Sequence, residues 1–452
     1  MDLATLTNST RNFLIVTMKC LDKFDALTSV TLGAIHTENR GTAENIKEIV
    51  TGCFQANNIS ESQIVAITTD GGSNLIKAAD LMDKDHIPCF CHVCDNIVSS
   101  AYSQCRVLNV LVDDVKGVVT YFKRSSLAMN ILRKKQREAT GKSLELIQAV
   151  KTRWNSTYAC IKRFSQLYPY VSSALKDPQI KKVKRDGSTE APKITDDTVE
   201  ILKQCLPLLQ PFDVITRKLS SSEKVTSSTA LFSVEYLETT LKNSNPTNSV
   251  AKELKERLIE QMQQRFEAVK NNQVLQAASF IDSRFRNLLS EKAKESTRSY
   301  LLRQMKEISL PEEADEENHT TAERDENLFV FRVDDFFDIG EDQEASVQIN
   351  VSPELELEKY ECENATKWDF NDDPLKFWIK NRALYPRLAR VSLGLLTVPG
   401  SAVDSERGVS QLNLVARKHR SKLSSLNINR LVCLRSLPIC FWERLLNLRG
   451  HD

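Results

Sequence analysis

The sequence predicts an α/β layer, in which helices pack against a mixed sheet, together with an all-α block. Over the first hundred residues, short segments rich in β-branched side chains alternate with amphipathic segments. From about 105 to 305 the apolar residues recur almost entirely with the 3.6-residue period of a helix, and Gly and Pro are sparse. The 452 residues exceed one ordinary core, so we expect two or three folding units.

The α/β part is expected within residues 1–125. Its strands are short and have turn-prone residues around them. Thr42 is a suitable N-cap for the first helix, because its hydroxyl can accept a backbone N–H of the first turn. In chain order we expect strands over 13–19 and 28–35, a helix over 42–50, a strand over 64–69, a helix from Ser73 and Asn74, a strand over 87–91 and a helix from near His92.

The all-α block is expected over residues 126–307, as an insertion in the α/β unit. Two amphipathic faces support it, one from Ile147 to Ile161 and one from Leu202 to Ile215. Residues 176–195 carry a run of basic side chains, a Gly and a Pro, and are expected to form an exposed loop.

Residues 308–366 are expected to be a flexible linker, because they are acidic and their apolar residues follow no regular period. Residues 311–346 contain fourteen Asp or Glu and two Arg, which gives a charge of −12. Since the whole chain carries +1, the rest carries about +13, a surplus that is compatible with nucleic-acid binding. Helical periodicity resumes over 367–440 and ends in an amphipathic helix over 426–437.

Composition excludes several classes of protein. No apolar run approaches the roughly 20 residues of a membrane span, so no membrane partner is expected. Residues 1–20 lack the basic start, apolar middle and cleavage site of a signal peptide. The eleven cysteines are odd in number and scattered, which favours free thiols in a reducing compartment. The motifs of P-loop nucleotide-binding proteins, α/β-hydrolases and H-E-x-x-H metalloproteases are absent from the sequence.

Two acidic motifs far apart in the chain are candidates for a divalent-metal site, which distant carboxylates can build together. Asp70 follows an apolar strand and precedes two glycines, a context that lets its carboxylate point into a crevice. The alternative is that Asp70 caps a turn or a helix. Glu406 lies near the start of a helix that Ser401 could cap, and the alternative there is a favourable interaction with the helix dipole. Asp404 cannot share a helical face with Glu406.

Residues 86–95 are rich in cysteine and histidine. Cys91 and Cys94 form a C-x-x-C pair, and Cys89 and His92 form a C-x-x-H pair. A structural zinc normally takes its ligands from two such pairs with a spacer between them, and no second pair follows. We therefore expect no structural zinc.

Trp154 is a candidate for nucleic-acid binding. It lies close to Lys151, Arg153 and Asn155 on a predicted helix, so that the group could stack on a base or contact a phosphate. The alternative is that Trp154 and Tyr158, four residues apart, pack in a core.

Taken in order, these motifs resemble those of the hAT superfamily of DNA transposases and its domesticated relatives, the zinc-finger BED domain-containing proteins. Each motif alone is weak, but their combination is highly specific and covers almost the whole chain. The residues that carry the resemblance are Asp2-Leu-Ala-Thr5, Phe13-Leu-Ile-Val-Thr17, His36-Thr37, Thr42-Ala-Glu-Asn-Ile46, Thr68-Thr-Asp70-Gly-Gly-Ser-Asn74, Cys89-Phe-Cys-His92, Arg153-Trp-Asn-Ser-Thr157, Tyr385-Pro-Arg-Leu-Ala-Arg390, Ser405-Glu-Arg407, and Arg420-Ser-Lys-Leu423 with Leu434-Arg435.

The resemblance implies a ribonuclease-H-like mixed sheet that is interrupted by a large α-helical insertion and completed by C-terminal helices. It implies that Asp2, Asp70 and Glu406 hold divalent cations, Mg²⁺ or Mn²⁺, in an active enzyme. The nucleic-acid contacts that it implies are Arg153, Trp154, Asn155, Cys89, His92 and Arg407. The implied dimerisation residues, within 367–440, are Tyr385, Leu388, Leu423, Ile428, Leu431 and Leu434.

Departures from the family pattern favour a domesticated or truncated protein without activity. The strand of Asp2 has no preceding chain to anchor it, and Ala4 replaces a Trp. Gly408 and Val409 replace an apolar residue and a Phe, and a Gly within a helix costs about 1 kcal/mol relative to Ala. The family's BED finger is missing from the sequence. We therefore expect a nuclear protein that dimerises and associates with DNA or chromatin in transcriptional regulation; the alternative is an active metal-dependent transposase.

Overall fold

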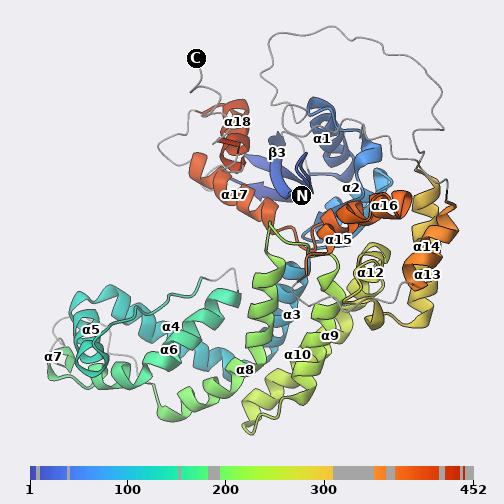
Figure 1. Ribbon diagram of the computed structural model, residues 1–452. Coiled ribbons are helices and arrows are strands. Elements are labelled where there is room, and N and C mark those ends of the chain that lie inside the picture. Colours follow the sequence, from blue (N-terminus) through green and yellow to red (C-terminus); the bar gives the residue numbers. More distant parts are fainter. Residues whose placement is uncertain are drawn as a thin grey trace. The chain divides into compact units, whose positions relative to one another are not determined.

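The chain is mostly helical and carries two small sheets, which confirms the predicted mixture of α and β structure (Figure 1). The computed structural model describes residues 1–6, 11–37, 41–150, 154–181, 194–308, 351–362, 372–416, 423–437 and 441–442. The core unit comprises Met1–His92, Lys218–Ser233 and Ala268–Asp452, and the helical unit comprises Val93–Arg217 and Val234–Glu267. The domain boundaries expected near residues 125 and 307 stay predictions.

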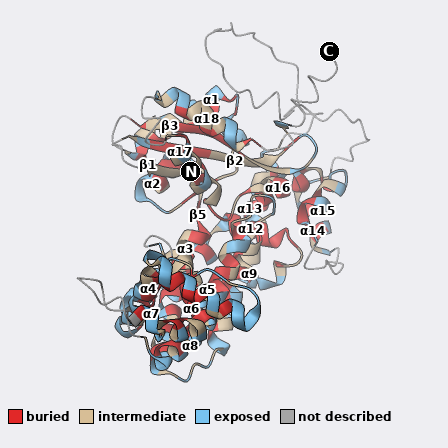
Figure 2. Cartoon of the chain, turned by 90° about the vertical axis from the view of Figure 1, so that its left-hand side faces the viewer, coloured by how far each residue is buried: buried red, intermediate tan, exposed pale blue. Residues whose placement is uncertain are grey.

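The core unit contains a three-stranded antiparallel sheet with the order β1 (Asp2–Thr5), β2 (Asn12–Leu21) and β3 (Leu27–Thr37). The strands expected over 13–19 and 28–35 are confirmed. Successive side chains of β2 point to opposite faces, so Leu14 and Val16 belong to one hydrophobic cluster and Phe13 and Ile15 to another. These four residues are all buried, because the sheet is covered on both faces (Figure 2).

A second, parallel sheet is formed by β4 (Ala66–Thr69) and β5 (Asp85–Pro88). The prediction of a single mixed sheet is therefore wrong in detail. The physical reason is that β1 has only four residues, all paired with β2, and that the chain meets β4 just before β1 begins, where the Met1 nitrogen donates a hydrogen bond to the Thr68 carbonyl at 2.7 Å. β5 lies slightly before the strand predicted over 87–91, and α3 (Phe90–Gln104) begins before His92.

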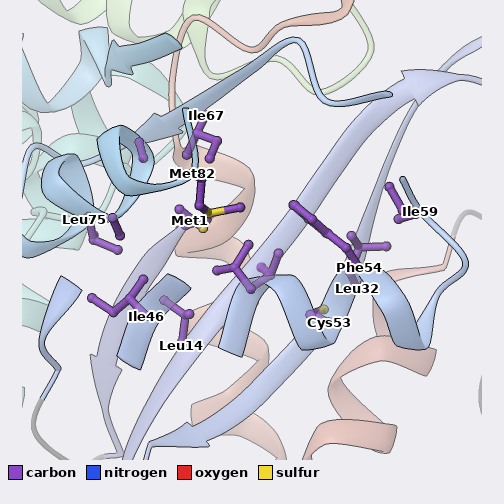
Figure 3. Close-up of a cluster of buried hydrophobic side chains, with 14 of the residues drawn as sticks. Met1, Leu14, Leu32, Ile46, Cys53, Phe54, Ile59, Ile67, Leu75 and Met82 are labelled. Carbon is purple, nitrogen blue, oxygen red and sulfur yellow. The ribbon is translucent and has the colours of Figure 1, made fainter. Parts of the chain in front are cut away.

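Helices α1 (Ala43–Ala56) and α2 (Ser73–Leu81) contribute to the cluster on one face of the larger sheet. Thr42 caps α1 as predicted, because its side chain accepts the Asn45 N–H at 3.4 Å. Figure 3 shows this cluster, in which Met1 lies near Ile67 and Met82. Its labelled members are Met1, Leu14, Leu32, Ile46, Cys53, Phe54, Ile59, Ile67, Leu75 and Met82.

Helices α17 (Val403–Val415) and α18 (Ser425–Ser436) pack on the opposite face of the sheet. α18 also covers β3, which is an edge strand of its sheet. The Asn429 Oδ1 accepts the Ala34 N–H at 2.8 Å, and the Ser436 Oγ accepts the Thr31 N–H at 3.1 Å. Side chains of α18 therefore satisfy backbone groups that a further strand would otherwise pair with.

The core unit also contains α12 (Gln273–Phe280), α13 (Glu291–Lys306), α14 (Pro353–Cys362), α15 (Pro374–Lys380), α16 (Pro386–Thr397) and a 3₁₀ turn over Arg286–Leu288. The flexible linker predicted over 308–366 is wrong at α14. Glu356, Leu357 and Tyr360 are buried there, and the Tyr360 ring lies 4.9 Å from that of Trp378. The acidic composition concealed this short apolar face. The predicted linker residues 309–350 and 363–366 lie outside the described part of the chain.

The helices that lie wholly in the helical unit are α4 (Arg106–Arg124), α5 (Ser126–Thr140), α6 (Trp154–Leu175), α7 (Pro178–Lys181) and α10 (Ser249–Arg265). Residues of both units form α3, α8 (Asp196–Leu219), α9 (Thr229–Asn243) and α11 (Glu267–Lys270). In the core unit, Glu61–Gln63 forms a 3₁₀ turn. The face predicted on α8 is confirmed, since Leu202, Leu209 and Phe212 are buried. The face predicted from Ile147 to Ile161 is wrong over its first part, because α5 ends at Thr140 and residues 142–150 are not helical.

α7 lies within the exposed loop predicted over 176–195, of which residues 182–193 are outside the described part. No helix among the described residues is both long enough and apolar enough to cross a membrane.

Candidate metal centre

Asp2 is held at the junction of the two sheets. All four residues of β1 pair with β2, and Asp2 is paired with Ile15. The bond from the Met1 nitrogen to Thr68 places the start of β1 beside the end of β4, which Asp70 directly follows. The expectation that the strand of Asp2 is poorly anchored is therefore wrong.

Glu406 reaches the same region from the first turns of α17. The hydroxyls of Thr17 on β2 and Ser405 on α17 are hydrogen-bonded at 2.8 Å. A Cβ added at Gly408 would lie 2.6 Å from Ile15 Cγ2, so the helix backbone packs directly against the residue that is paired with Asp2. The glycine counted above as a departure from the family pattern is thus required by this packing, since even Ala would clash.

Asp2 interacts electrostatically with both Asp70 and Glu406. Burial, together with the nearby charges of Asp70 and Glu406, raises the pKa of Asp2 to about 6, although the Met1 ammonium and the backbone N–H of Leu3 oppose the rise. Mutual repulsion of this kind is what a bound divalent cation relieves. The donor set, carboxylate oxygens alone, is the one that Mg²⁺ and Mn²⁺ prefer.

The carboxylate oxygens of Asp2, Asp70 and Glu406 do not converge on one point in this structure. Among the described residues, no three acidic, His or Cys side chains lie close enough together to hold a metal ion as they stand. One cause is that Asp70 turns its Oδ1 back to accept the Gly72 N–H at 3.0 Å, which is the turn-capping alternative considered for this residue. Asp404 is engaged elsewhere, with Ser29 at 2.9 Å and with Arg407.

His86 is a neighbour of this site that the sequence did not single out as a site residue. Its Nε2 is hydrogen-bonded to the Thr69 hydroxyl at 2.8 Å, next to Asp70. Burial lowers the pKa of His86, although the charges of Asp80 and Asp70 oppose this shift, so the neutral imidazole is favoured. It was missed because the strand predicted over 87–91 begins one residue after it, whereas β5 begins at Asp85.

The predicted nucleic-acid residues near the site have different surroundings. Cys89 is buried, and its sulfur accepts the Ala402 N–H at 3.2 Å, so it fixes the start of α17. A hydrogen bond with Cys91, together with burial, raises the pKa of Cys89, which therefore stays a thiol. His92 is half-buried in the first turn of α3. Arg407 is exposed and donates to the Ser220 carbonyl at 2.6 Å as well as pairing with Asp404.

The predicted nucleic-acid residues of the helical unit are held by packing. Trp154 is 7% exposed and lies against the rings of Tyr158 and Phe212, with ring centroids 6.3 Å away in both cases. Its indole N–H has no hydrogen-bond partner among the described residues. The alternative of core packing therefore describes Trp154 in this structure. Asn155 donates to Asp213 at 3.3 Å, and Arg153 lies outside the described residues.

The six predicted dimerisation residues divide by burial. Tyr385, Leu388 and Ile428 are fully buried in the chain's own core, and Leu423 and Leu431 are partly buried against the cluster beneath α17 and α18. Leu434, in contrast, is 41% exposed. Two other leucines of these helices are also exposed, Leu426 on α18 and Leu414 on α17.

Two protein-family models match parts of the chain. The model of the hAT family C-terminal dimerisation region matches residues 356–437, and that of the ZBED1 RNase-like helical domain matches residues 87–201. The chain is 25% identical over 460 residues to the putative AC transposase of Zea mays, a match that covers 94% of this chain and 54% of the relative. The chain is a relative of the hAT superfamily transposases.

Two further relatives are a transposase and a zinc finger BED domain-containing protein. The hAT relative is 25% identical to the transposable element Hobo transposase of Drosophila melanogaster, with 87% of this chain and 62% of that protein covered. It is 20% identical to the zinc finger BED domain-containing protein 4 of Homo sapiens, with 84% of this chain and 31% of that protein covered. The chain thus spans between about a third and somewhat less than two thirds of these relatives' lengths.

Proposed function

We propose that this hAT relative binds divalent cations through Asp2, Asp70 and Glu406 and cleaves and joins DNA strands. The observation that carries the proposal is that the charges of Asp70, after β4, and of Glu406, at the start of α17, both act on Asp2 of β1. Two departures that argued against activity have a different account: β1 is fully paired, and Gly408 is needed for packing. A ribonuclease-H-like core is part of the same proposal, supported by the antiparallel sheet followed by a helix and the parallel pair β4–β5.

A divalent cation bound at this site would activate water or a 3′-hydroxyl and stabilise the charge that develops on the phosphodiester. The chain's own groups would do the rest. Asp70 would exchange its bond to Gly72 for the cation, and ionised Asp2 and Glu406 would complete the acidic set. The guanidinium of Arg407, exposed one residue after Glu406, is suited to hold a DNA phosphate, and Asp404 limits its freedom.

The direct test is incubation of the purified chain with supercoiled and linear DNA in Mg²⁺, Mn²⁺ or EDTA. Cleavage is expected with either cation and is expected to stop when EDTA removes it. If no DNA is cleaved at millimolar Mn²⁺, the catalytic proposal fails.

Self-association is a second candidate function, carried by the match of residues 356–437 to a dimerisation region. In this form the protein would be a domesticated, nuclear regulator that associates with DNA or chromatin as a dimer. The residues best placed for contact with a second copy are the exposed Leu414, Leu426 and Leu434, because the buried members of the predicted set already fill the core.

A charge introduced on this surface is expected to weaken the dimer. For Leu426→Asp, we expect the dissociation constant to rise at least about tenfold, because an unpaired carboxylate would have to be buried in the interface. Sedimentation velocity over a range of concentrations measures this. Asn427→Asp is the matched control, since it adds the same charge at the exposed neighbouring position. An unchanged oligomer in Leu426→Asp would exclude this surface.

A further inference from the structure

Residues 219–228, here called the return segment, join α8 to α9 and belong to the core unit. Three consecutive hydroxyl residues in it, Thr226, Ser227 and Ser228, are each no more than 2% exposed. Buried hydroxyls in a connecting segment are costly unless they are hydrogen-bonded. Each of these three has a partner far away in the sequence, so the segment has a specific structural task.

The first partners lie in the loop that leads to Glu406. The Thr226 hydroxyl accepts the Gly400 N–H at 2.9 Å, and the Ser401 hydroxyl donates to the Leu219 carbonyl at 2.7 Å. The approach is close, since a Cβ added at Gly400 would lie 2.9 Å from the Thr226 carbonyl oxygen. The return segment therefore holds the loop 399–402 by backbone contact as well as by side chains.

The same loop is held on its other side by the strand that precedes Asp70. The Thr68 hydroxyl donates to the Pro399 carbonyl at 2.8 Å, and the Phe90 N–H donates to the Gly400 carbonyl at 3.0 Å. Gly400 is thus fixed through its N–H by the return segment and through its carbonyl by the start of α3. Residue 400 lies six positions before Glu406, so these bonds set where α17 begins relative to β4.

Further hydrogen bonds connect the return segment to β2, to α16, to α17 and to the turn that follows α12. The Lys19 ammonium on β2 donates to the carbonyls of Ser221 at 3.3 Å and Lys224 at 3.0 Å. The Ser227 hydroxyl donates to the Leu395 carbonyl at 3.0 Å, and that of Ser228 to Asp282 at 2.7 Å. Arg407 reaches the Ser220 carbonyl from α17.

We propose that the return segment, acting through Thr226, positions Glu406 against Asp2 and Asp70, so that Thr226 is a positioning residue of the cation site. The role of Glu406 as a cation ligand rests on the proposed function. The mechanism is indirect: the hydroxyl of Thr226 fixes Gly400, and Gly400 fixes the entry into α17. Outer residues that orient metal ligands in this way typically change metal affinity by roughly 10- to 100-fold when they are removed.

The test compares Thr226→Val, which removes the hydroxyl at nearly constant shape, with Thr226→Ser, which keeps it. Thr198→Val is the matched control, since Thr198 is a buried threonine of the helical unit whose hydroxyl bonds to that of Thr195 at 3.0 Å. By calorimetric titration of Mn²⁺, we expect about tenfold weaker binding in Thr226→Val, and wild-type binding in Thr226→Ser and Thr198→Val.

Amide hydrogen exchange without metal gives an independent readout. Thr226→Val is expected to speed exchange over residues 400–408 by on the order of tenfold, and Thr226→Ser is expected to leave it unchanged. If exchange over 400–408 stays as in the wild type, the positioning role is overturned. It is also overturned if Thr226→Val, still folded, binds Mn²⁺ as tightly as the wild type. Should the wild type bind no Mn²⁺, the proposed function fails by itself, and the exchange result alone decides on the positioning role.

Discussion

Replacing Glu406 by Gln is expected to reduce Mn²⁺-dependent DNA cleavage by roughly a hundredfold or more, because a metal-ligated site supplies several kcal/mol of transition-state stabilisation. The substitution keeps the size of the side chain and removes one of the charges that raise the pKa of Asp2. The metal-free variant should therefore be at least as stable as the wild type. Initial rates of plasmid nicking, measured beside thermal unfolding of the same sample, test both parts.

Asp404→Asn is the matched control for this experiment. Asp404 lies on the same helix, but its carboxylate is bonded to Ser29 and Arg407 and is no part of the proposed cation site. We expect it to change stability modestly and to leave the requirement for Mn²⁺ intact. Equal loss of cleavage in Asp404→Asn and Glu406→Gln would mean that the start of α17 has a general structural role and that Glu406 is no ligand.

Replacing Glu356 by Ala is expected to lower the free energy of unfolding by about 3 kcal/mol. Its buried carboxylate accepts the backbone N–H groups of Leu388 at 2.9 Å and Arg387 at 3.1 Å, at the start of α16. Without it, these N–H groups and the nearby Arg387 guanidinium would stay buried without their anionic partner. Urea denaturation followed by circular dichroism measures the loss.

Glu358→Ala removes the same kind of side chain from an exposed position on the same helix, and its effect is expected to be small. If both variants unfold at the same urea concentration as the wild type, α14 does not dock on α16 in solution. That result would restore the prediction of a flexible linker for this stretch.

The sequence predicted those features that depend on local pattern. β2 and β3 have the β-branched residues of strands, and Thr42 caps its helix as its position suggests. Composition misled at α14, where a run of acidic residues hides Leu357 and Tyr360 on one helical face. The separation into two sheets depends on which strands pair with each other, and the periodicity of a single segment does not contain that information.

At the candidate site, the sequence named the three acids but not what holds them together. Asp70 and Glu406 are 336 positions apart, and the loop that leads to Glu406 is bonded through Pro399 to Thr68 and through Gly400 to Thr226. The same limit applies to Gly408. A Cβ at this position would clash with Ile15, and only the structure shows that Ile15 lies there. Trp154 shows the converse, since a side chain suited to bind nucleic acid is used in packing.

The measurement that tests the account most directly is calorimetric titration of Mn²⁺ into the purified chain and into Glu406→Gln. It should be made near pH 7.5, above the pKa of about 6 of Asp2, because the protonated carboxyl group is a poor cation ligand. We expect saturable binding in the wild type, weaker binding near pH 5, and loss of binding in Glu406→Gln. Absence of binding in the wild type, or equal binding in both proteins, would contradict the assignment of Asp2, Asp70 and Glu406 as a metal centre.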